Sequence, residues 1–168
     1  MSHSCAPFVE RSAKNASPIA STDVRTWLQD LESGTALGWK DRMDDDIEWM
    51  STCPADGPLG QTCPTSGVFR GKDSTIKDLF MPMWARFIEK PKYEFTDIFV
   101  QPSEMNDPSE RHLTKAVIEM KATGIMKSNG KDWVNYHCAV LHWDNETQKV
   151  IKVRSYLDSA AVNKAFEG

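Results

Sequence analysis

The chain has 168 residues, of which 40% are hydrophobic and 26% charged, a balance typical of a globular domain with its own core. The net charge is −4 at pH 7 and no dense run of Lys or Arg occurs, which argues against a nucleic-acid partner. No apolar stretch approaches the ~18 residues that span a bilayer, and the N-terminal residues lack the apolar segment of a signal peptide. We therefore expect a cytoplasmic protein that binds neither nucleic acid nor membrane.

The cysteines predict no metal site. Cys5, Cys53, Cys63 and Cys138 lack the tight paired spacing of zinc ligands, and in the cytoplasm they are expected to be reduced. Cys53 and Cys63 flank one loop and could pair under oxidation. We expect neither a metal nor another cofactor.

The first half of the chain predicts helices ahead of a sheet. Residues 1–20 are rich in Ser, Ala and Pro and predict a flexible N-terminal arm, followed by a single domain over 21–168. A capping signal at Ser21 or Thr22 and apolar residues at helical spacing predict a first helix that ends at Gly34. The other elements expected here are a short helix over 37–43, a solvated acidic turn at 44–46, a strand over 47–51, an irregular rim or lid at 53–71, and a helix over 72–89 kinked at Pro82.

The second half predicts strands. Four runs read as strands (93–100, 113–127, 133–143 and 149–158), Asn129-Gly130 marks a hairpin, and 159–166 reads as a short terminal helix. Helices segregated ahead of a run of strands predict an α+β fold. We expect a curved, mixed, mainly antiparallel sheet wrapped around three N-terminal helices, cone-shaped, with an internal pocket between sheet and helices.

The strand WVNYHCAVLHW (133–143) is apolar or aromatic on both faces. Asn135 and His137 share one face, and Val134 and Tyr136 share the other. Because neither face is plainly solvated, we expect one to line a pocket for a small molecule and the other to contact a partner subunit. A slip of one residue in register would exchange the two faces.

Four segments, taken in order, resemble the nuclear transport factor 2-like superfamily, and the last is the most SnoaL-like. They are DDDIEW (44–49), the start of the third helix at 71–76, NGKDWVNYHCAVLHWD (129–144) and KVIKVRSYLDSAAV (149–162). This group includes ketosteroid isomerases, limonene epoxide hydrolases, scytalone dehydratases and SnoaL-type polyketide cyclases. The resemblance implies a pocket on the concave face of the sheet and a homodimer through its convex face.

The catalytic patterns of two of these families are not retained. The ketosteroid isomerase pattern, aligned without gaps, places its oxyanion-binding tyrosine at Trp27, its general-base aspartate at Ser51 and its second oxyanion acid at Ala139. The limonene epoxide hydrolase pattern places its water-activating aspartate at Ser155. The resemblance therefore supports the fold without supporting either chemistry.

His137, Asp97 and Asn135 are the candidate catalytic residues. His137 could move a proton near neutral pH, while Asn135 and Trp27 hold the oxygen on which charge builds up. The alternative is a core histidine whose ring nitrogens are already bonded. Asp97 could share a face with Tyr93 and other aromatic residues, where desolvation would raise its pKa, or it could lie on a wet face.

The expected pocket is apolar and holds a small apolar molecule. Its predicted substrate-binding residues are Trp27, Trp49, Ser51, Phe80, Trp84, Met120, Met126, Ser155 and Leu157. These features predict a cofactor-independent isomerase, cyclase or dehydratase that acts by acid–base catalysis on a natural-product intermediate such as a polyketide or terpenoid. The alternative is a ligand-binding or dimeric interaction protein of the same fold without catalysis.

Overall fold

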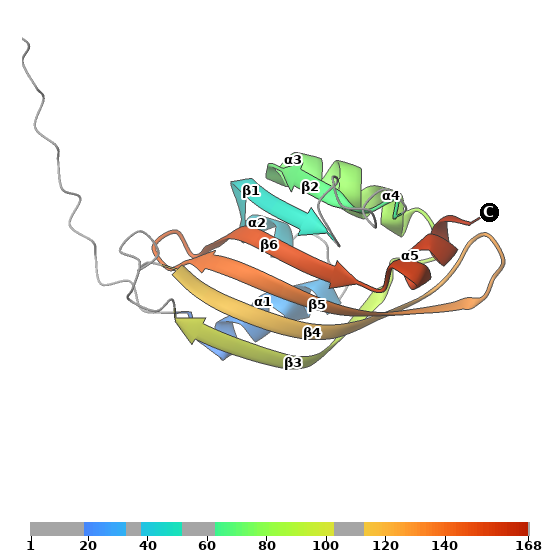
Figure 1. The fold of residues 1–168 in the computed structure, drawn as a ribbon. Helices are drawn as coiled ribbons and strands as arrows, with labels where there is room; N and C mark the ends of the chain where they lie inside the picture. Colours follow the sequence, from blue (N-terminus) through green and yellow to red (C-terminus); the bar gives the residue numbers. More distant parts are fainter. Residues whose placement is uncertain (1–18, 33–37, 52–62, 103–112, 168) are drawn as a thin grey trace, which may run out of the picture.

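A computed structural model describes residues 19–32, 38–51, 63–102 and 113–167 (Figure 1). The elements are α1 (Ser21–Glu32), α2 (Gly38–Asp41), β1 (Met43–Ser51), β2 (Gly67–Arg70), α3 (Lys72–Ser74), η1 (Thr75–Phe80), α4 (Met81–Trp84), β3 (Lys92–Pro102), β4 (Leu113–Ile125), β5 (Asp132–Asp144), β6 (Lys149–Leu157) and α5 (Ser159–Phe166). Most of the expected N-terminal arm and much of the expected rim at 53–71 lie outside the described residues.

The six strands form one curved sheet in the order β2-β1-β6-β5-β4-β3 (Figure 1). Strands β1 and β6 pair in parallel, and every other neighbouring pair is antiparallel. Helix α1 packs on the sheet at β3. Elements α3, η1 and α4 follow one another as one helical rod beside β1 and β2. The expected α+β architecture is confirmed. No helix in the described segments is both long and apolar enough to cross a membrane.

The inner face of the sheet and the helices enclose the main core. In β5 the odd-numbered residues are buried or half-buried, as shown by Asn135 and Trp143, which are fully buried. Their even-numbered neighbours Val134 and Tyr136 are exposed. The expected division of strand 133–143 into two faces is therefore confirmed, with the face of His137 turned towards the helices.

Two sequence expectations in the first half are wrong. Residues 44–46 belong to β1 instead of forming a turn. Asp45 in this stretch pairs with Lys72 at the start of the helical rod, and the pairing of β1 with β6 is irregular there. The segment expected to be irregular at 53–71 contains β2, which pairs antiparallel with β1. Such a short edge strand is defined by its partner more than by its own sequence.

The third helix is shorter than expected and wider in its middle. It ends at Trp84, and residues Thr75–Phe80 form a π-helix immediately before the last turn. Pro82 has no N–H to give to the preceding turn, and a π-segment is one way in which a helix accommodates such a break in its hydrogen bonding. The expected irregularity near Pro82 is thus present as a widened turn.

The second half matches its sequence signals closely. Gly130 has φ 69° in the turn between β4 and β5, the left-handed conformation that glycine tolerates best. Asp158 caps α5, since its carboxylate accepts hydrogen bonds from the backbone N–H groups of Ala160 and Ala161. The N-cap places α5 directly after β6, against the hairpin end of β5.

Candidate functional site

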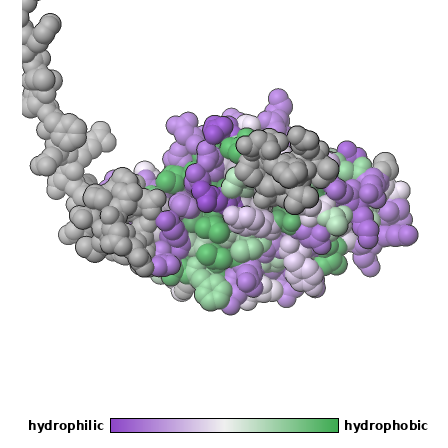
Figure 2. Space-filling view, in the orientation of Figure 1, coloured by the Kyte–Doolittle hydropathy of each residue, from purple (hydrophilic) through white to green (hydrophobic). Residues whose placement is uncertain are grey.

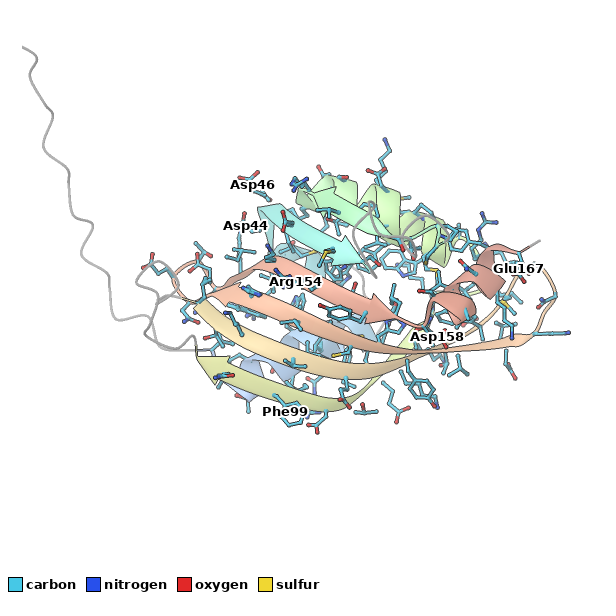
Figure 3. All side chains as sticks on the ribbon, viewed as in Figure 1. Asp44, Asp46, Phe99, Arg154, Asp158 and Glu167 are labelled. Carbon is cyan, nitrogen blue, oxygen red and sulfur yellow. The ribbon has the colours of Figure 1, made fainter. Side chains whose placement is uncertain are left out.

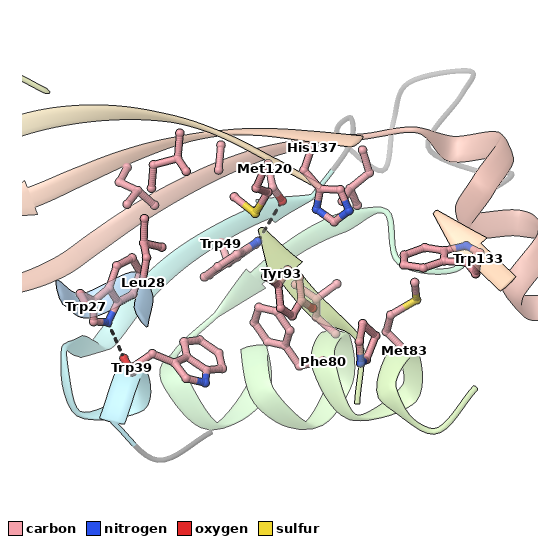
Figure 4. Close-up of a pocket in the computed structure, with 17 residues that line it drawn as sticks. Trp27, Leu28, Trp39, Trp49, Phe80, Met83, Tyr93, Met120, Trp133 and His137 are labelled. Carbon is pink, nitrogen blue, oxygen red and sulfur yellow. Dashed lines mark hydrogen bonds between the residues drawn. The ribbon is translucent and has the colours of Figure 1, made fainter. Parts of the chain in front are cut away.

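A small apolar cavity lies between the inner face of the sheet and the helices (Figure 4). The volume inside it that can hold the centre of a water-sized sphere is ≈ 90 Å³. Its walls are aromatic and aliphatic side chains from α1, α2, η1 and the strands, and its polar members are His137, Tyr93, Ser155 and the tryptophan indoles. No Asp, Glu, Lys or Arg of the described segments lines it.

His137 reaches into this cavity from β5. In register it lies between Met120 of β4 and Leu157 of β6, both apolar, and Figure 4 shows its ring directed towards the helical rod. The Nε2 atom is buried and has no hydrogen-bond partner among the described groups. Burial lowers the pKa of His137 to about 4, so the ring is neutral near pH 7. The alternative of a core histidine with both nitrogens bonded is not what the described residues show.

Tyr93 is a cavity residue that sequence reasoning did not select. It comes from β3, where it faces Ala122 of β4, and its ring stands edge-on to that of His137 with 6.4 Å between centroids. Burial raises the pKa of the Tyr93 phenol, and the nearby indole N–H of Trp84 lowers it by a smaller amount without meeting hydrogen-bond geometry. The phenol is therefore protonated and can donate. The sequence did hold a signal for it, because Tyr93 lies two residues before Phe95 on a predicted strand and therefore shares a face with it.

The indole N–H groups of Trp27 and Trp49 are already used. Trp27 Nε1 donates to the carbonyl oxygen of Trp39 at 3.0 Å, and Trp49 Nε1 donates to Ser155 Oγ at 3.1 Å (Figure 4). Ser155 Oγ in turn donates to the carbonyl oxygen of Met50 at 3.4 Å. The expectation that Trp27 stabilises a developing oxyanion is therefore wrong, because its donor is bonded to the backbone of α2.

Most of the predicted wall residues line the cavity, and three do not. Those that line it are Trp27, Trp49, Phe80, Met120, Ser155 and Leu157. Ser51 is fully buried beside Ser155 in the β1–β6 pairing but lies outside the cavity wall. Trp84 packs edge-on against Trp39 behind the wall, and Met126 belongs to a separate cluster with Phe87 at the hairpin end of the sheet.

Asp97 does not lie among aromatic residues inside the molecule. A bulge at Thr96 inserts one residue between Phe95, which opposes Met120, and Asp97, which opposes Glu119. The insertion turns Asp97 to the outer face, where it is exposed and its Oδ1 accepts a hydrogen bond from the backbone N–H of Ile98 at 2.8 Å. The catalytic placement expected for Asp97 is wrong.

Asn135 lies on the inner face but does not line the cavity. Its Nδ2 donates to the carbonyl oxygen of Asp158 at 3.0 Å, and its Oδ1 accepts from the backbone N–H of the same residue at 3.3 Å. Both ends of the amide are therefore committed to the turn that starts α5. The structure does not bring Asn135 and His137 together as a catalytic pair.

Trp39 is another cavity residue that sequence reasoning missed. It is almost fully buried, lies edge-on to Trp49 and Phe80, and its Nε1 has no partner within the described segments. The short helix predicted over 37–43 was the signal for it.

No group of three or more His, Cys, Asp or Glu residues in the described part of the chain is placed to hold a metal ion. Cys63 is a buried free thiol, while Cys53 lies outside the described residues.

No family model matches the sequence, and no curated protein matches it. Solved structures do match. A nuclear transport factor 2-like protein from Burkholderia thailandensis is 13% identical with a TM-score of 0.62, over 88% of this chain and 96% of that one. A proposed isomerase from Bacillus subtilis is 13% identical with a TM-score of 0.58, over 86% and 90%. PrhC from Penicillium brasilianum is 11% identical with a TM-score of 0.60, over 86% and 83%.

At these identities the likeness concerns the fold alone. The matches extend over most of each chain, and the curved sheet with helices on its inner face is the feature that they share with this protein. On this evidence the chain has the fold of the nuclear transport factor 2-like superfamily.

Proposed function

We propose that the protein is a cofactor-independent isomerase, cyclase or dehydratase that moves a proton on a small apolar molecule. The observation that carries this proposal is the unpaired, buried Nε2 of His137 beside a cavity with apolar walls. A buried polar atom without a partner is uncommon in folded proteins, and a catalytic or ligand-binding role is one explanation for such an atom. A bound ligand would supply the missing hydrogen bond.

His137 acts in this proposal as a neutral imidazole. It removes a proton from a carbon next to the ligand's carbonyl group and returns it at a second position. The lowered pKa makes the free ring a weak base, but an enolate forming next to it would favour the imidazolium and raise that pKa. Asp97 and Asn135 take no part, because the first faces outward and the second is bonded to Asp158.

The size of the cavity bears on the substrate. An apolar cavity of about 150 Å³ holds one benzene molecule, whereas this one offers ≈ 90 Å³. We propose a natural-product intermediate of the polyketide or terpenoid kind as the substrate. By this comparison even a compound with one six-membered ring requires the cavity wall to yield slightly, and an intermediate with several rings would require the helical rod to move away from the sheet.

Deuterium incorporation tests the proposed function. The protein is incubated in D₂O with cyclohexanone and 2-cyclohexenone, and loss of the α-proton signals is followed by proton NMR. We expect faster exchange with the unaltered protein than with the His137→Ala and His137→Phe variants. The control is His142→Phe, on the same strand but the opposite face. Equal exchange by the His137 variants would remove His137 as the acid–base group.

A ligand-binding protein without catalysis is the second candidate. It is favoured by the absence of any carboxylate among the described residues that line the cavity, since a general acid usually accompanies a base in such sites. The same experiment separates the candidates. Binding of the ketone seen by ligand-observed NMR, with no protein-dependent exchange, would support this second function.

We further propose that the protein works in the cytoplasm as a homodimer joined through the outer face of the sheet. That face exposes Phe99 and Tyr156, which are large and apolar for a surface in contact with water.

A further inference from the structure

Two uncharged polar side chains meet at one place in a cavity whose walls are mostly apolar. His137 and Tyr93 stand on strands β5 and β3, on either side of β4, and both point to the inner face. Tyr93 pairs with Ala122 of β4, and His137 pairs with Met120, two residues earlier on the same strand. The two rings therefore lie close together, edge-on, with 6.4 Å between their centroids. Figure 4 shows both rings facing the same space above the helical rod.

We propose that His137 and Tyr93 together recognise a single oxygen atom on a small uncharged ligand, a ketone or alcohol built on one ring, and that the cavity rejects carboxylates and amines. The inference rests on the proposed function in taking this cavity as the ligand site. It goes further by naming Tyr93 as a recognition residue and by restricting the charge and size of the ligand.

The donor and acceptor inventory fits one oxygen. A neutral imidazole offers one donor and one acceptor, and a protonated phenol offers a donor and an accepting oxygen. A carbonyl oxygen can accept from the Tyr93 hydroxyl, and an alcohol can both accept from Tyr93 and donate to the free nitrogen of His137. The Trp27 and Trp49 indoles cannot serve, because their N–H groups are bonded to Trp39 and Ser155.

Charge is excluded by the surroundings. No ionic side chain of the described segments lines the cavity, so a carboxylate or an ammonium would be buried without a counter-ion. Burying an unpaired ion is far more costly than burying a hydroxyl or a carbonyl that finds a hydrogen bond. The same desolvation that lowers the pKa of His137 and raises the pKa of Tyr93 would act on a ligand's own charge.

A matched series of ring compounds tests the inference on the unaltered protein. The probes are cyclohexanone, cyclohexanol, methylcyclohexane, cyclohexanecarboxylate and cyclohexylammonium, and binding is measured by ligand-observed NMR titration near pH 7.4. We expect cyclohexanone and cyclohexanol to bind at least about ten-fold more tightly than either ion. Equal or tighter binding of an ion would overturn the inference, and so would a lack of preference for the oxygen compounds over methylcyclohexane.

Tyr93→Phe and His137→Phe then test the two recognition residues. Each variant should weaken cyclohexanol binding by about five-fold and leave methylcyclohexane binding unchanged, since one hydrogen bond is lost in each case. The matched controls are Tyr136→Phe and His142→Phe, both on the outward face of β5. Unchanged cyclohexanol binding by the Tyr93 variant, with its fold confirmed by circular dichroism, would remove Tyr93 from the site.

The outcomes separate the inference from the proposed function. Selective binding of neutral ring compounds without deuterium exchange would support this inference and contradict the catalytic proposal. Exchange that depends on His137 but is unaffected by Tyr93→Phe, together with equal binding of ions, would support the catalytic proposal and overturn the inference.

Discussion

At the scale of the single residue, His137 is held in surroundings that oppose its positive charge. Its neighbours across the sheet are Met120 and Leu157, and burial alone lowers its pKa from the ordinary 6.5 to about 4. Such a shift links protonation to folding, because the unfolded chain binds the proton more readily than the folded protein does. The cavity that provides a free nitrogen for a ligand therefore also makes the fold sensitive to acid.

The first prediction concerns this acid sensitivity. The stability contributed by a neutral His137 is complete above pH ~6.5 and is lost as the pH falls towards 4, since the unfolded state is protonated first. The loss over this range is roughly 3 kcal/mol. His137→Phe should remove that part of the pH dependence. Urea unfolding of both proteins at several pH values between 7 and 4 measures it.

The quantity to compare is the difference between the free energies of unfolding of the two proteins at each pH, because carboxylates also titrate between pH 7 and 4. Their contribution is common to both proteins and cancels. If the free energies of unfolding of the unaltered protein and of His137→Phe ran parallel from pH 7 to 4, the imidazole would not be buried as described.

At the scale of the elements, the start of β5 and the start of α5 are joined by side chains on the inner face of β5. The Asn135 amide bonds to both the carbonyl oxygen and the N–H of Asp158, and Asp158 in turn caps α5. Trp133 Nε1 donates to the carbonyl oxygen of Ala161 at 2.6 Å. These contacts fix the helix across the end of the sheet, next to the cavity wall formed by Trp133 and Leu157.

The second prediction is that Asn135 stabilises this junction and is not needed for chemistry. Asn135→Leu keeps the branched shape of the side chain but leaves the N–H and carbonyl of Asp158, which are part-buried at this junction, without these partners, and should lower the free energy of unfolding by about 1–2 kcal/mol. Hydrogen exchange should show α5 opening more readily than in the unaltered protein. Urea unfolding and exchange of the α5 amides are the measurements.

Asn163→Ala is the matched control. Asn163 lies on α5 itself, and its Oδ1 has no partner among the described groups, so its removal should change stability little. A similar loss of stability in both variants would contradict the role assigned to the Asn135 amide.

The same elements show what sequence could and could not predict. Alternation along β4 and β5 was sufficient to turn His137 inward and Tyr136 outward, because side chains on a strand change faces at every residue. The bulge at Thr96 shifted that alternation in β3 and turned Asp97 outward. A bulge of this kind depends on the partner strand, so it left no signal in the run YEFTDIFV.

Long-range hydrogen bonds were equally hidden. Nothing in the neighbourhood of Trp27 indicates that its indole N–H reaches the carbonyl of Trp39, which folds back from the next helix. The partnership of Asn135 with Asp158 likewise spans two strands of the sheet. Sequence patterns therefore predicted which side chains face the cavity better than they predicted which polar atoms in it are free.

At the scale of the whole molecule, the described part of the outer face of the sheet exposes large apolar side chains. Phe99, Tyr136 and Tyr156 are 57%, 65% and 48% exposed, and Figure 3 shows Phe99 extending from β3. Figure 2 shows apolar side chains gathered over the middle of this face, with polar ones around them. In register, Phe99 continues into a row with Val117 and Val140 across β4 and β5. A continuous apolar row on an exposed sheet is typical of an association surface.

The third prediction is that two copies of the chain associate through this row. Size-exclusion chromatography with light scattering should give twice the 19.0 kDa chain mass, and Phe99→Lys should shift the protein to the monomer. A lysine there would lose the hydration of its charge in the interface, which costs more than the lost apolar contact. Met81→Lys is the control, because Met81 is comparably exposed but lies on α4, over the other face of the sheet. A monomer for the unaltered protein, or equal dissociation by Met81→Lys, would show that the row does not join two copies.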